Sequence, residues 1–333
     1  MKNITIADVA KHANISKSTV SQYLNKRYEY MSEKTRKKIE ETIKELNYEP
    51  NIIARSLKQK STFTVGVVVA NILHTFSTQI IRAIENYFYQ QGFHIIVCNA
   101  DDEPKKEKKY IEMLRAKQVD GIIIFPTGGN LDLYKRMKRD RFPIVFMDRT
   151  IKDLDIATVM LDNQLAAQLA IDHFVEKGYK NIAIVTTSII RSISPRVERI
   201  RGYKDTLESY GIQIKTDYIK TADLKKISAE LSELFDLKKP PDAILAGNDI
   251  VLNEVLRYMK KYDLKIPEDA AIIGIDEVPF ANFYTPTITT VKQPTIEMAN
   301  RAAELLLSQI NKAGEIDTSV HRFKPTLLPR SSG

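Results

Sequence analysis

The 333-residue chain has no tryptophan and only one cysteine, Cys98. A single cysteine excludes an internal disulfide, so we expect Cys98 to be a buried, inert thiol in a reducing compartment. Glycine and proline are scarce, with 12 and 13 residues, which argues against a disordered chain. No apolar run is long enough for a transmembrane helix, and the opening segment has no apolar core of a signal peptide. These absences predict a globular cytoplasmic protein with no membrane partner.

Motifs of catalysis are also missing. The chain contains no HExxH, GxSxG, GxxxxGK[ST] or GxGxxG pattern, and its five histidines are scattered. We therefore expect no enzyme, no metal site and no cofactor. A transport binding protein is a second alternative, but that class needs an export signal.

Positive charge is concentrated at the N-terminus. Residues 1–60 carry 13 Lys and Arg against 7 Asp and Glu, a net +6 of the total +8. A small basic module on a nearly neutral body indicates a polyanionic partner, most often nucleic acid. The alternative is an ordinary solvated helical face.

The first fifty residues predict three short helices. Thr5 and Asp8 have the spacing of a capping box, and Ser16 can cap a second helix over 17–25. Ser32 can cap the third. The first two helices, joined by "NIS", fit a helix-turn-helix, whose second helix lies in the DNA major groove.

The predicted second helix has one apolar and one polar side. With its apolar residues turned inward, the polar residues Lys17, Ser18, Ser21 and Gln22 face outward. Lysine can bind guanine and glutamine can bind adenine through the major groove, while serine suits several bases. The alternative is a plain three-helix bundle with a polar surface.

The segment "YEPNIIARSLKQKST" follows. Asn51 can cap a helical stretch over 52–57 that is too short to be stable alone in water. Leu57 lies between Arg55 and Lys58, a combination that suits an apolar wedge at a minor-groove base step with cations on the flanking phosphates. A linker with a buried leucine is the alternative.

From Phe63 onward, buried strands alternate with amphipathic helices in two successive series. "FTVGVVVA" and "VDGIIIFP" are typical of strands buried on both faces. The pattern predicts two α/β lobes with parallel, doubly wound sheets, and a ligand at the carboxyl ends of the strands. The fold class is thus an all-α helix-turn-helix domain with a hinge helix, followed by a two-lobed α/β domain.

The segments "TIADVAKHANISKSTVSQYLN", "LNYEPNIIARSL", "LAGNDIVLNEVL" and "IIGIDEVPFANFYTPTITTVKQP" together resemble the LacI/GalR family of bacterial transcription regulators. The resemblance covers essentially the whole chain. It implies a homodimer whose paired hinge helices insert their leucines into a palindromic operator. The domain boundaries expected are 1–50 for DNA binding, 51–61 for the hinge, and 62–333 for the body, with subdomains 62–161 plus 292–322 and 162–291 plus 323–333.

The resemblance also implies which residues bind DNA. Lys17, Ser18 and Gln22 fall on base-reading positions, and Asn25 lies near the end of the same helix. The DNA-binding residues expected are Thr5, Ser16, Lys17, Ser18, Thr19, Ser21, Gln22, Asn25, Tyr28, Asn51, Ala54, Arg55, Leu57 and Lys58.

By the same resemblance, the body is similar to a periplasmic sugar-binding protein with a small-molecule effector between its lobes. The effector-binding residues expected are Phe76, Ser77, Asp148, Arg149, Arg196, Arg199, Asn248, Asp276 and Gln293. Asp249 is expected to cap the helix that follows it, and His74 to be a ligand contact or a spectator.

The arginines suggest the chemistry of the effector. Arg149 and Arg196 or Arg199, with Arg191 nearby, favour an anion such as a sugar acid or sugar phosphate, since arginine binds carboxylate and phosphate bidentately. "RYEYMSEKT" is also similar to repressors of ketodeoxygluconate and related uronate pathways. Arginines that form salt bridges between the lobes are the alternative.

The sequence does not show whether the effector weakens or strengthens binding to the operator. We expect a repressor of a carbohydrate-utilisation operon that the effector releases; a neutral sugar, a corepressor or a protein coeffector are the alternatives. The chain ends at "LLPRSSG" without the leucine-rich helix that makes some relatives tetramers, so a dimer is expected.

Overall fold

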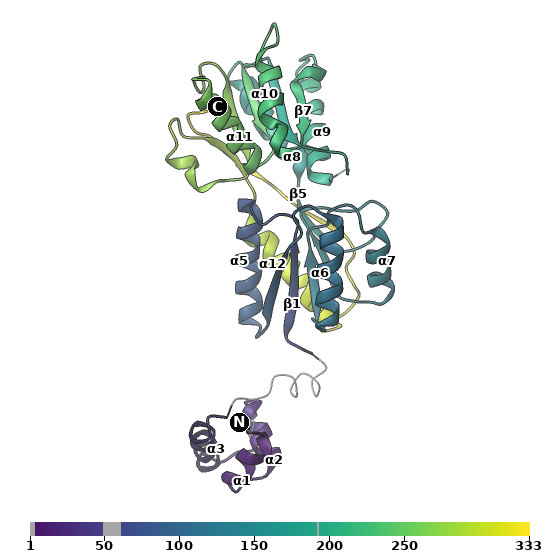
Figure 1. Ribbon diagram of the computed structural model, residues 1–333, viewed down its shortest axis with the longest axis vertical. Helices are drawn as coiled ribbons and strands as arrows, with labels where there is room; N and C mark the ends of the chain where they lie inside the picture. The colour runs from purple at the N-terminus through teal and green to yellow at the C-terminus, as the bar shows by residue number, and fades with distance from the viewer. Residues whose placement is uncertain (1–3, 49–60, 192) are drawn as a thin grey trace. The chain divides into compact units, whose positions relative to one another are not determined.

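The computed structural model describes residues 4–48, 61–191 and 193–333. They form two compact units, divided between Phe63 and Thr64. The first is built from helices alone, and the second from two α/β lobes (Figure 1). The predicted fold class is confirmed for these two units, while the hinge helix falls outside the described residues.

The first unit contains α1 (Ile6–His12), α2 (Lys17–Leu24) and α3 (Glu33–Glu45). Its core is a small apolar cluster around Val9 and Val20, neither of which has exposed surface. Because this core is small, the ends of the helices depend on capping side chains.

All three predicted caps are present. Thr5 and Asp8 form the reciprocal capping box of α1, with the Thr5 amide donating to the Asp8 carboxylate at 2.8 Å. The hydroxyls of Ser16 and Ser32 accept the amides of Thr19 and Thr35 at 3.1 and 3.2 Å.

The second unit consists of two lobes with one six-stranded sheet each. The first sheet contains β1 (Thr64–Val69), β2 (His94–Asn99), β3 (Gly121–Ile124), β4 (Ile144–Met147), β5 (Thr158–Leu161) and β11 (Val320–Phe323). The second contains β6 (Ile182–Thr187), β7 (Ile219–Ala222), β8 (Ala243–Ala246), β9 (Ala271–Ile275), β10 (Thr289–Lys292) and β12 (Thr326–Leu328).

Helices cover both faces of each sheet. On the first lobe, α5 (Thr75–Gln90) and α12 (Thr295–Ile310) cover one face, and α6 (Pro104–Ala116) and α7 (Leu131–Arg139) the other (Figure 1). On the second lobe the pairs are α8 (Asn163–Glu176) with α9 (Ser194–Ser209), and α10 (Ile227–Phe235) with α11 (Asp249–Lys261). Both sheets are therefore buried on two faces, which explains the near-continuous apolar runs of their strands.

The two sheets repeat one topology. Their strand orders are β2-β1-β3-β4-β5-β11 and β7-β6-β8-β9-β10-β12. In each sheet the second strand along the chain lies on one side of the first strand and the later strands lie on the other side, so the strand order reverses at β1 and at β6. All ladders are parallel except the β10–β12 pair. In such sheets the crevice at the carboxyl ends of the strands, near the reversal, is the usual ligand site.

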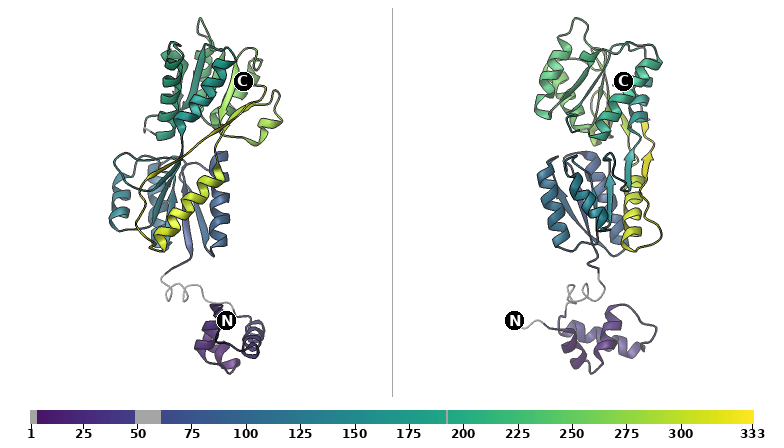
Figure 2. Two further views of the ribbon diagram at one scale, coloured as in Figure 1. Left: turned by 180° about the vertical axis from the view of Figure 1, so that it is seen from behind. Right: turned by 90° about the vertical axis from the view of Figure 1, so that its right-hand side faces the viewer.

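The chain passes between the lobes three times, along one side of the unit (Figure 2): after β5, after β10 and after β11. Two strands, β11 and β12, lie near the C-terminus, one in each sheet. Pro325 separates them, because proline has no N–H for a ladder. The strands β5 and β7, each only four residues long, are absent from the sequence prediction.

Cys98 is buried in β2, and burial raises the pKa of its thiol, as expected of an inert cysteine. Among the described residues, none of the helices combines the length and apolar character needed to cross a membrane.

The contact between α8 and α9 is unusually close. A Cβ on Gly202 would lie 2.5 Å from the carbonyl oxygen of Gln164, which is backbone and cannot rotate away. In an open helix the change from glycine to alanine would stabilise by about 1 kcal/mol. Here we expect Gly202→Ala to lower the free energy of unfolding by about 1–3 kcal/mol through overpacking. Chemical denaturation checks this, with the exposed Lys204→Ala on the same helix as control; equal stability of Gly202→Ala and wild type would contradict it.

Candidate nucleic-acid interface and effector pocket

The surface of α2 presents the polar residues predicted to read bases. Lys17, Ser18 and Gln22 are exposed, and Ser21 is half-buried. The apolar side of the helix, with Val20, packs into the core of the unit. α2 therefore offers one lysine, one amide and serine hydroxyls on its outer side.

Other residues predicted to bind DNA hold the ends of α2. The Ser16 hydroxyl lies 2.7 Å from that of Ser18 and 2.8 Å from that of Thr19. The Asn25 side-chain amide donates to the Ser21 carbonyl at 2.7 Å. These contacts fix the backbone of α2 and the directions of its outer side chains.

The segment after α2 is ordered by aromatic contacts. The guanidinium of Arg36 lies 4.2 Å above the ring of Tyr28, whose other neighbour is Tyr23 in an edge-on contact. Tyr30 is 88% exposed. Sequence reasoning missed Tyr30, although its position between two predicted helices is a signal for an exposed aromatic.

The predicted hinge residues Asn51, Ala54, Arg55, Leu57 and Lys58 lie outside the described residues. Their roles stay predictions.

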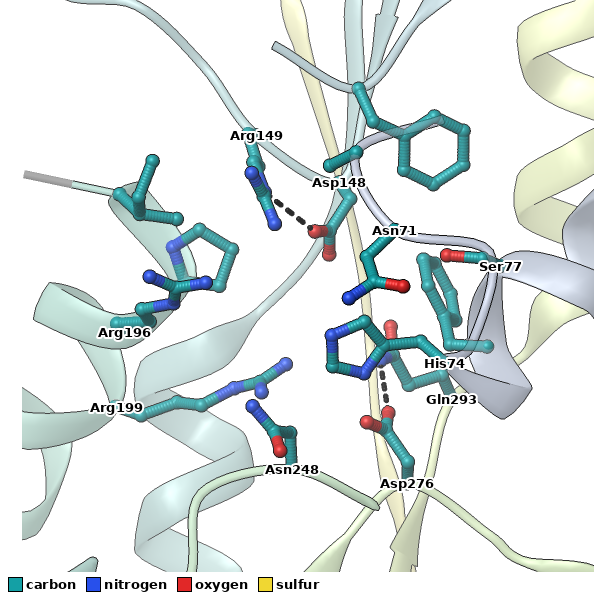
Figure 3. Close-up of a pocket in the computed structure, with 15 residues that line it drawn as sticks. Asn71, His74, Ser77, Asp148, Arg149, Arg196, Arg199, Asn248, Asp276 and Gln293 are labelled. Carbon is teal, nitrogen blue, oxygen red and sulfur yellow. Dashed lines mark hydrogen bonds and ion pairs between the residues drawn. The ribbon is translucent and has the colours of Figure 1, made fainter. Parts of the chain in front are cut away.

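The second unit contains a cavity between its lobes, at the carboxyl ends of the strands (Figure 3). All nine predicted effector residues line it: Phe76, Ser77, Asp148, Arg149, Arg196, Arg199, Asn248, Asp276 and Gln293. The structure adds His74, which was expected to be a ligand contact or a spectator, and residues that were not predicted as effector contacts: Ala70, Asn71, Phe125, Ile193 and Pro195. Phe125 directly follows β3 and Asn71 lies two residues after the end of β1, so strand-end position is the signal that was available for them.

Two aspartates occupy equivalent places in the two lobes. Asp148 follows β4 and Asp276 follows β9, and their amides donate to Val159 and Val291 of the next strand at 2.7 and 3.0 Å. Both have left-handed backbone, with φ of 68° and 87°. This conformation is costly for a residue other than glycine, and it turns each carboxyl into the cavity. Burial raises the pKa of the Asp276 carboxyl, and Gln293 donates to it at 2.5 Å.

Arg199 is held rigidly by its own lobe. Its Nε donates to Asn163 Oδ1 at 2.8 Å and its Nη1 to the Gly247 carbonyl at 2.6 Å. Arg199 lies one turn before Gly202, so the close packing of α8 and α9 brings it to Asn163. The position of this guanidinium is therefore fixed before any ligand binds.

Arg149 and Arg196 share one carboxylate. Asp102, in the loop between β2 and α6, accepts Arg149 Nη1 at 2.7 Å and lies 3.5 Å from Arg196 Nη2. Burial lowers the pKa of Arg196 to about 10, and repulsion from Arg149 adds to this effect. Asp102 was not a predicted site residue, because nothing in the local sequence shows that its loop meets these arginines.

The helix-capping role expected for Asp249 is wrong. Asn248 caps α11 instead, accepting the amide of Val251 at 2.9 Å. Asp249 reaches the other lobe, where its carboxylate lies 2.6 Å from both the His74 ring nitrogen and the Thr75 amide. The His74 side chain makes no capping hydrogen bond at the start of α5, so the Asp249 carboxylate satisfies this helix terminus across the lobe boundary. His74 is thus a partner of Asp249.

The cavity is small, about 40 Å³, which is room for a few water molecules. A second cavity of about 300 Å³ adjoins it and shares Asn71, His74 and Arg196. Thr187, Asp223 and Ile250 also line this outer cavity. Among the described residues, no cluster of histidine, cysteine and carboxylate side chains has the arrangement of a metal site.

The basic helix-turn-helix unit and the two-lobed α/β unit define a ligand-responsive regulator class. Residues 5–51 match the family model of bacterial regulatory proteins of the lacI family, and residues 171–333 match a periplasmic binding protein-like domain. The chain is 47% identical to a Paenibacillus polymyxa protein described as "Probable HTH-type transcriptional regulator EndR", over 98% of both chains. It is 35% identical to the HTH-type transcriptional regulator KdgR of Bacillus subtilis, over 92% of this chain and 91% of the relative.

Solved structures give the same result. A Lac repressor dimer bound to operator and the anti-inducer ONPF is 25% identical, with a TM-score of 0.84 over 99% of both chains. A CelR–cellobiose complex, 24% identical with a TM-score of 0.74 over 99% of this chain and 100% of that one, shares the fold. The chain belongs to the lacI family of bacterial transcriptional regulators.

The contact of Asp249 with His74 and Thr75 predicts a stability effect. Burial opposes ionisation, but His74 and the Thr75 amide hold the pKa of Asp249 below its ordinary value. We expect Asp249→Asn to lower the free energy of unfolding at neutral pH by about 1–3 kcal/mol. Because the pKa is lowered in the fold, the contribution is present above the ordinary pKa and is lost as pH falls through the folded-state value.

Urea unfolding at several pH values tests this. Glu254→Gln, which removes an exposed pair with Arg257 on the same helix, is the matched control and should have little effect. A deficit of Asp249→Asn that stays constant down to pH 3 would contradict the assignment.

Proposed function

We propose that this regulator binds a palindromic operator as a homodimer and represses a carbohydrate-utilisation operon. An anionic effector, a sugar acid or sugar phosphate, binds between the lobes and releases the DNA. The observation that carries the effector class is the set of three buried or half-buried guanidiniums around one small cavity.

The DNA-binding part of the proposal is supported by the exposed face of α2 and its rigid caps. Lys17 and Gln22 can pair with guanine and adenine edges in the major groove. The Lac repressor structure bound to operator supports both the DNA partner and the dimer. Exposed Tyr89 on α5 and Val97 on the edge strand β2 provide apolar surface suited to a partner subunit.

The anionic effector is supported by charge. Arg196 is half-buried, and its lowered pKa shows that its surroundings stabilise the positive charge poorly. Arg149 Nε is buried and, within the described part of the chain, makes no hydrogen bond; the Asp148 carboxylate is 3.5 Å away. An oxyanion would supply the acceptor that Arg149 Nε lacks, and it would give Arg196 a closer anionic partner than Asp102, which lies 3.5 Å from Nη2.

A neutral sugar is the second candidate. Asp148, Asn248, Asp276 and Gln293 offer the acceptors and amides that bind sugar hydroxyls, and the structural neighbour CelR is a complex with cellobiose. In that case the arginines serve to join the lobes, as the contact between Arg196 and Asp102 already does.

Gln22→Ala and Lys17→Ala should each weaken binding to the operator by about 1–3 kcal/mol, because each loses a base contact. Binding to random DNA should change little for Gln22→Ala. Fluorescence anisotropy with labelled operator and random duplexes measures both. Lys44→Ala, which removes the same charge on α3 beside Glu40, is the control. An equal loss for all variants on both duplexes would refute base reading by α2.

Arg149→Met and Arg196→Met should abolish binding of a hexuronate and leave operator binding intact, since each removes one of the two guanidiniums expected to pair with its carboxylate. Calorimetric titration suits this chain, which has no tryptophan for fluorescence. Arg201→Met, an exposed arginine on the same helix as Arg196 and paired with Asp205, is the matched control. Unchanged hexuronate affinity in the pocket variants would sink the anionic-effector proposal.

A further inference from the structure

Asp102 meets every arginine at the outer side of the inner cavity. Its carboxylate contacts Arg149 at 2.7 Å and Arg196 at 3.5 Å, and its backbone carbonyl accepts a hydrogen bond from Arg191. Asp102 and Arg149 belong to the first lobe, whereas Arg191 and Arg196 belong to the second. One residue therefore pairs with two of the pocket's arginines and joins the lobes.

The carboxylate is ionised in this position. Burial opposes ionisation, but Arg149 and Arg196 hold the pKa of Asp102 below its usual value. One negative charge is thus shared by two guanidiniums. Asp148 also approaches Arg149, but none of the described carboxylates other than Asp102 forms an ion pair with Arg196.

The same contacts separate the two cavities. Arg196 lines both, Arg149 lines the inner one, and Asp102 lines the outer one. The inner cavity, about 40 Å³, has room for only a few water molecules, so a sugar ring fits only if the groups between the cavities move. The contact of Asp102 with Arg149 and Arg196 lies at this boundary.

We propose that Asp102 is an internal counter-ion that occupies the arginine pair of the empty pocket, and that the oxyanion of the effector takes its place. This inference rests on the proposed anionic effector. It makes Asp102 a specificity-determining residue: an oxyanion can replace it at the arginines, whereas a neutral sugar has no charge with which to replace it. It also couples effector binding to the loss of a contact between the lobes.

The charge of Asp102 then opposes anion binding. Removing one negative charge a few ångströms from an incoming oxyanion should strengthen its binding on the order of tenfold or more. The affinity for a neutral sugar should hardly change. If Asp102 instead hydrogen-bonds the hydroxyls of a ligand, its removal weakens binding of every sugar.

The experiment is calorimetric titration of the full-length protein and of Asp102→Asn. The probes are glucuronate and galacturonate, glucose 6-phosphate, and the neutral sugars glucose and galactose. Asp101→Asn is the matched control, because Asp101 is the preceding residue and pairs with Lys106 outside the cavity. Asp102→Ser is a second variant in case the amide does not fold. Carboxylate and phosphate probes distinguish the two kinds of oxyanion.

Tighter binding of an oxyanion to Asp102→Asn, with Asp101→Asn like wild type, supports the inference. If wild type binds a sugar acid or phosphate and Asp102→Asn binds it equally or more weakly, the inference is wrong and the proposed effector class stands. If wild type binds only neutral sugars, the effector class is wrong. In that case a thermal-shift measurement with acetate tests the counter-ion role of Asp102. Acetate should raise the melting temperature of Asp102→Asn but not that of wild type. No rise in the variant would overturn the counter-ion role as well.

Discussion

The central constraint on the second unit is that the strands of both lobes end at one small cavity. Parallel strands present their carboxyl ends at the same edge, so the loops that follow them bring charged side chains together. Charges removed from water must find partners, and here the partners often belong to the opposite lobe. Asp249 caps α5 of the other lobe, and Asp102 meets Arg196 and Arg191. The pairing of the charged side chains in the pocket and the arrangement of the lobes therefore depend on each other.

This constraint gives the pocket two kinds of side chain. Arg199 is fixed within one lobe by Asn163 and Gly247, and Asp148 and Asp276 are fixed by their left-handed backbone. Arg196 and Asp102, by contrast, contact each other across the lobes, in addition to a partner that each has in its own lobe. A ligand gains affinity from its contacts with the fixed side chains. A ligand that also replaces the contacts between the lobes binds one arrangement of the lobes more tightly than the other. Only the second kind of contact can shift an equilibrium between two states.

Much of this organisation could be predicted from the sequence. Periodicity and capping residues located the helices of the first unit, because a capping serine acts on neighbours three residues away. Most of the buried strands were also clear from their apolar runs, although β5 was missed. The nine predicted pocket residues came from a resemblance, and the structure brings all nine to one cavity. What failed were relations between distant segments. Asp249 has the local context of a cap, and only the fold shows that its carboxylate also accepts the first amide of α5 in the other lobe.

Asp102 shows why such relations decide specificity. Its sequence neighbourhood, "NADDEP", marks a polar loop before a helix and nothing more. A search for charged ligand contacts would count three arginines and infer a strongly cationic pocket. The fold places a carboxylate between two of them, so the pocket is much less cationic than that count implies. The affinity for an anion then depends on the difference in free energy between two ion pairs, that of the arginines with Asp102 and that of the arginines with the ligand. A difference of this kind changes sign with small changes in geometry, which makes the loop between β2 and α6 an effective place for relatives to diverge in the ligands they bind.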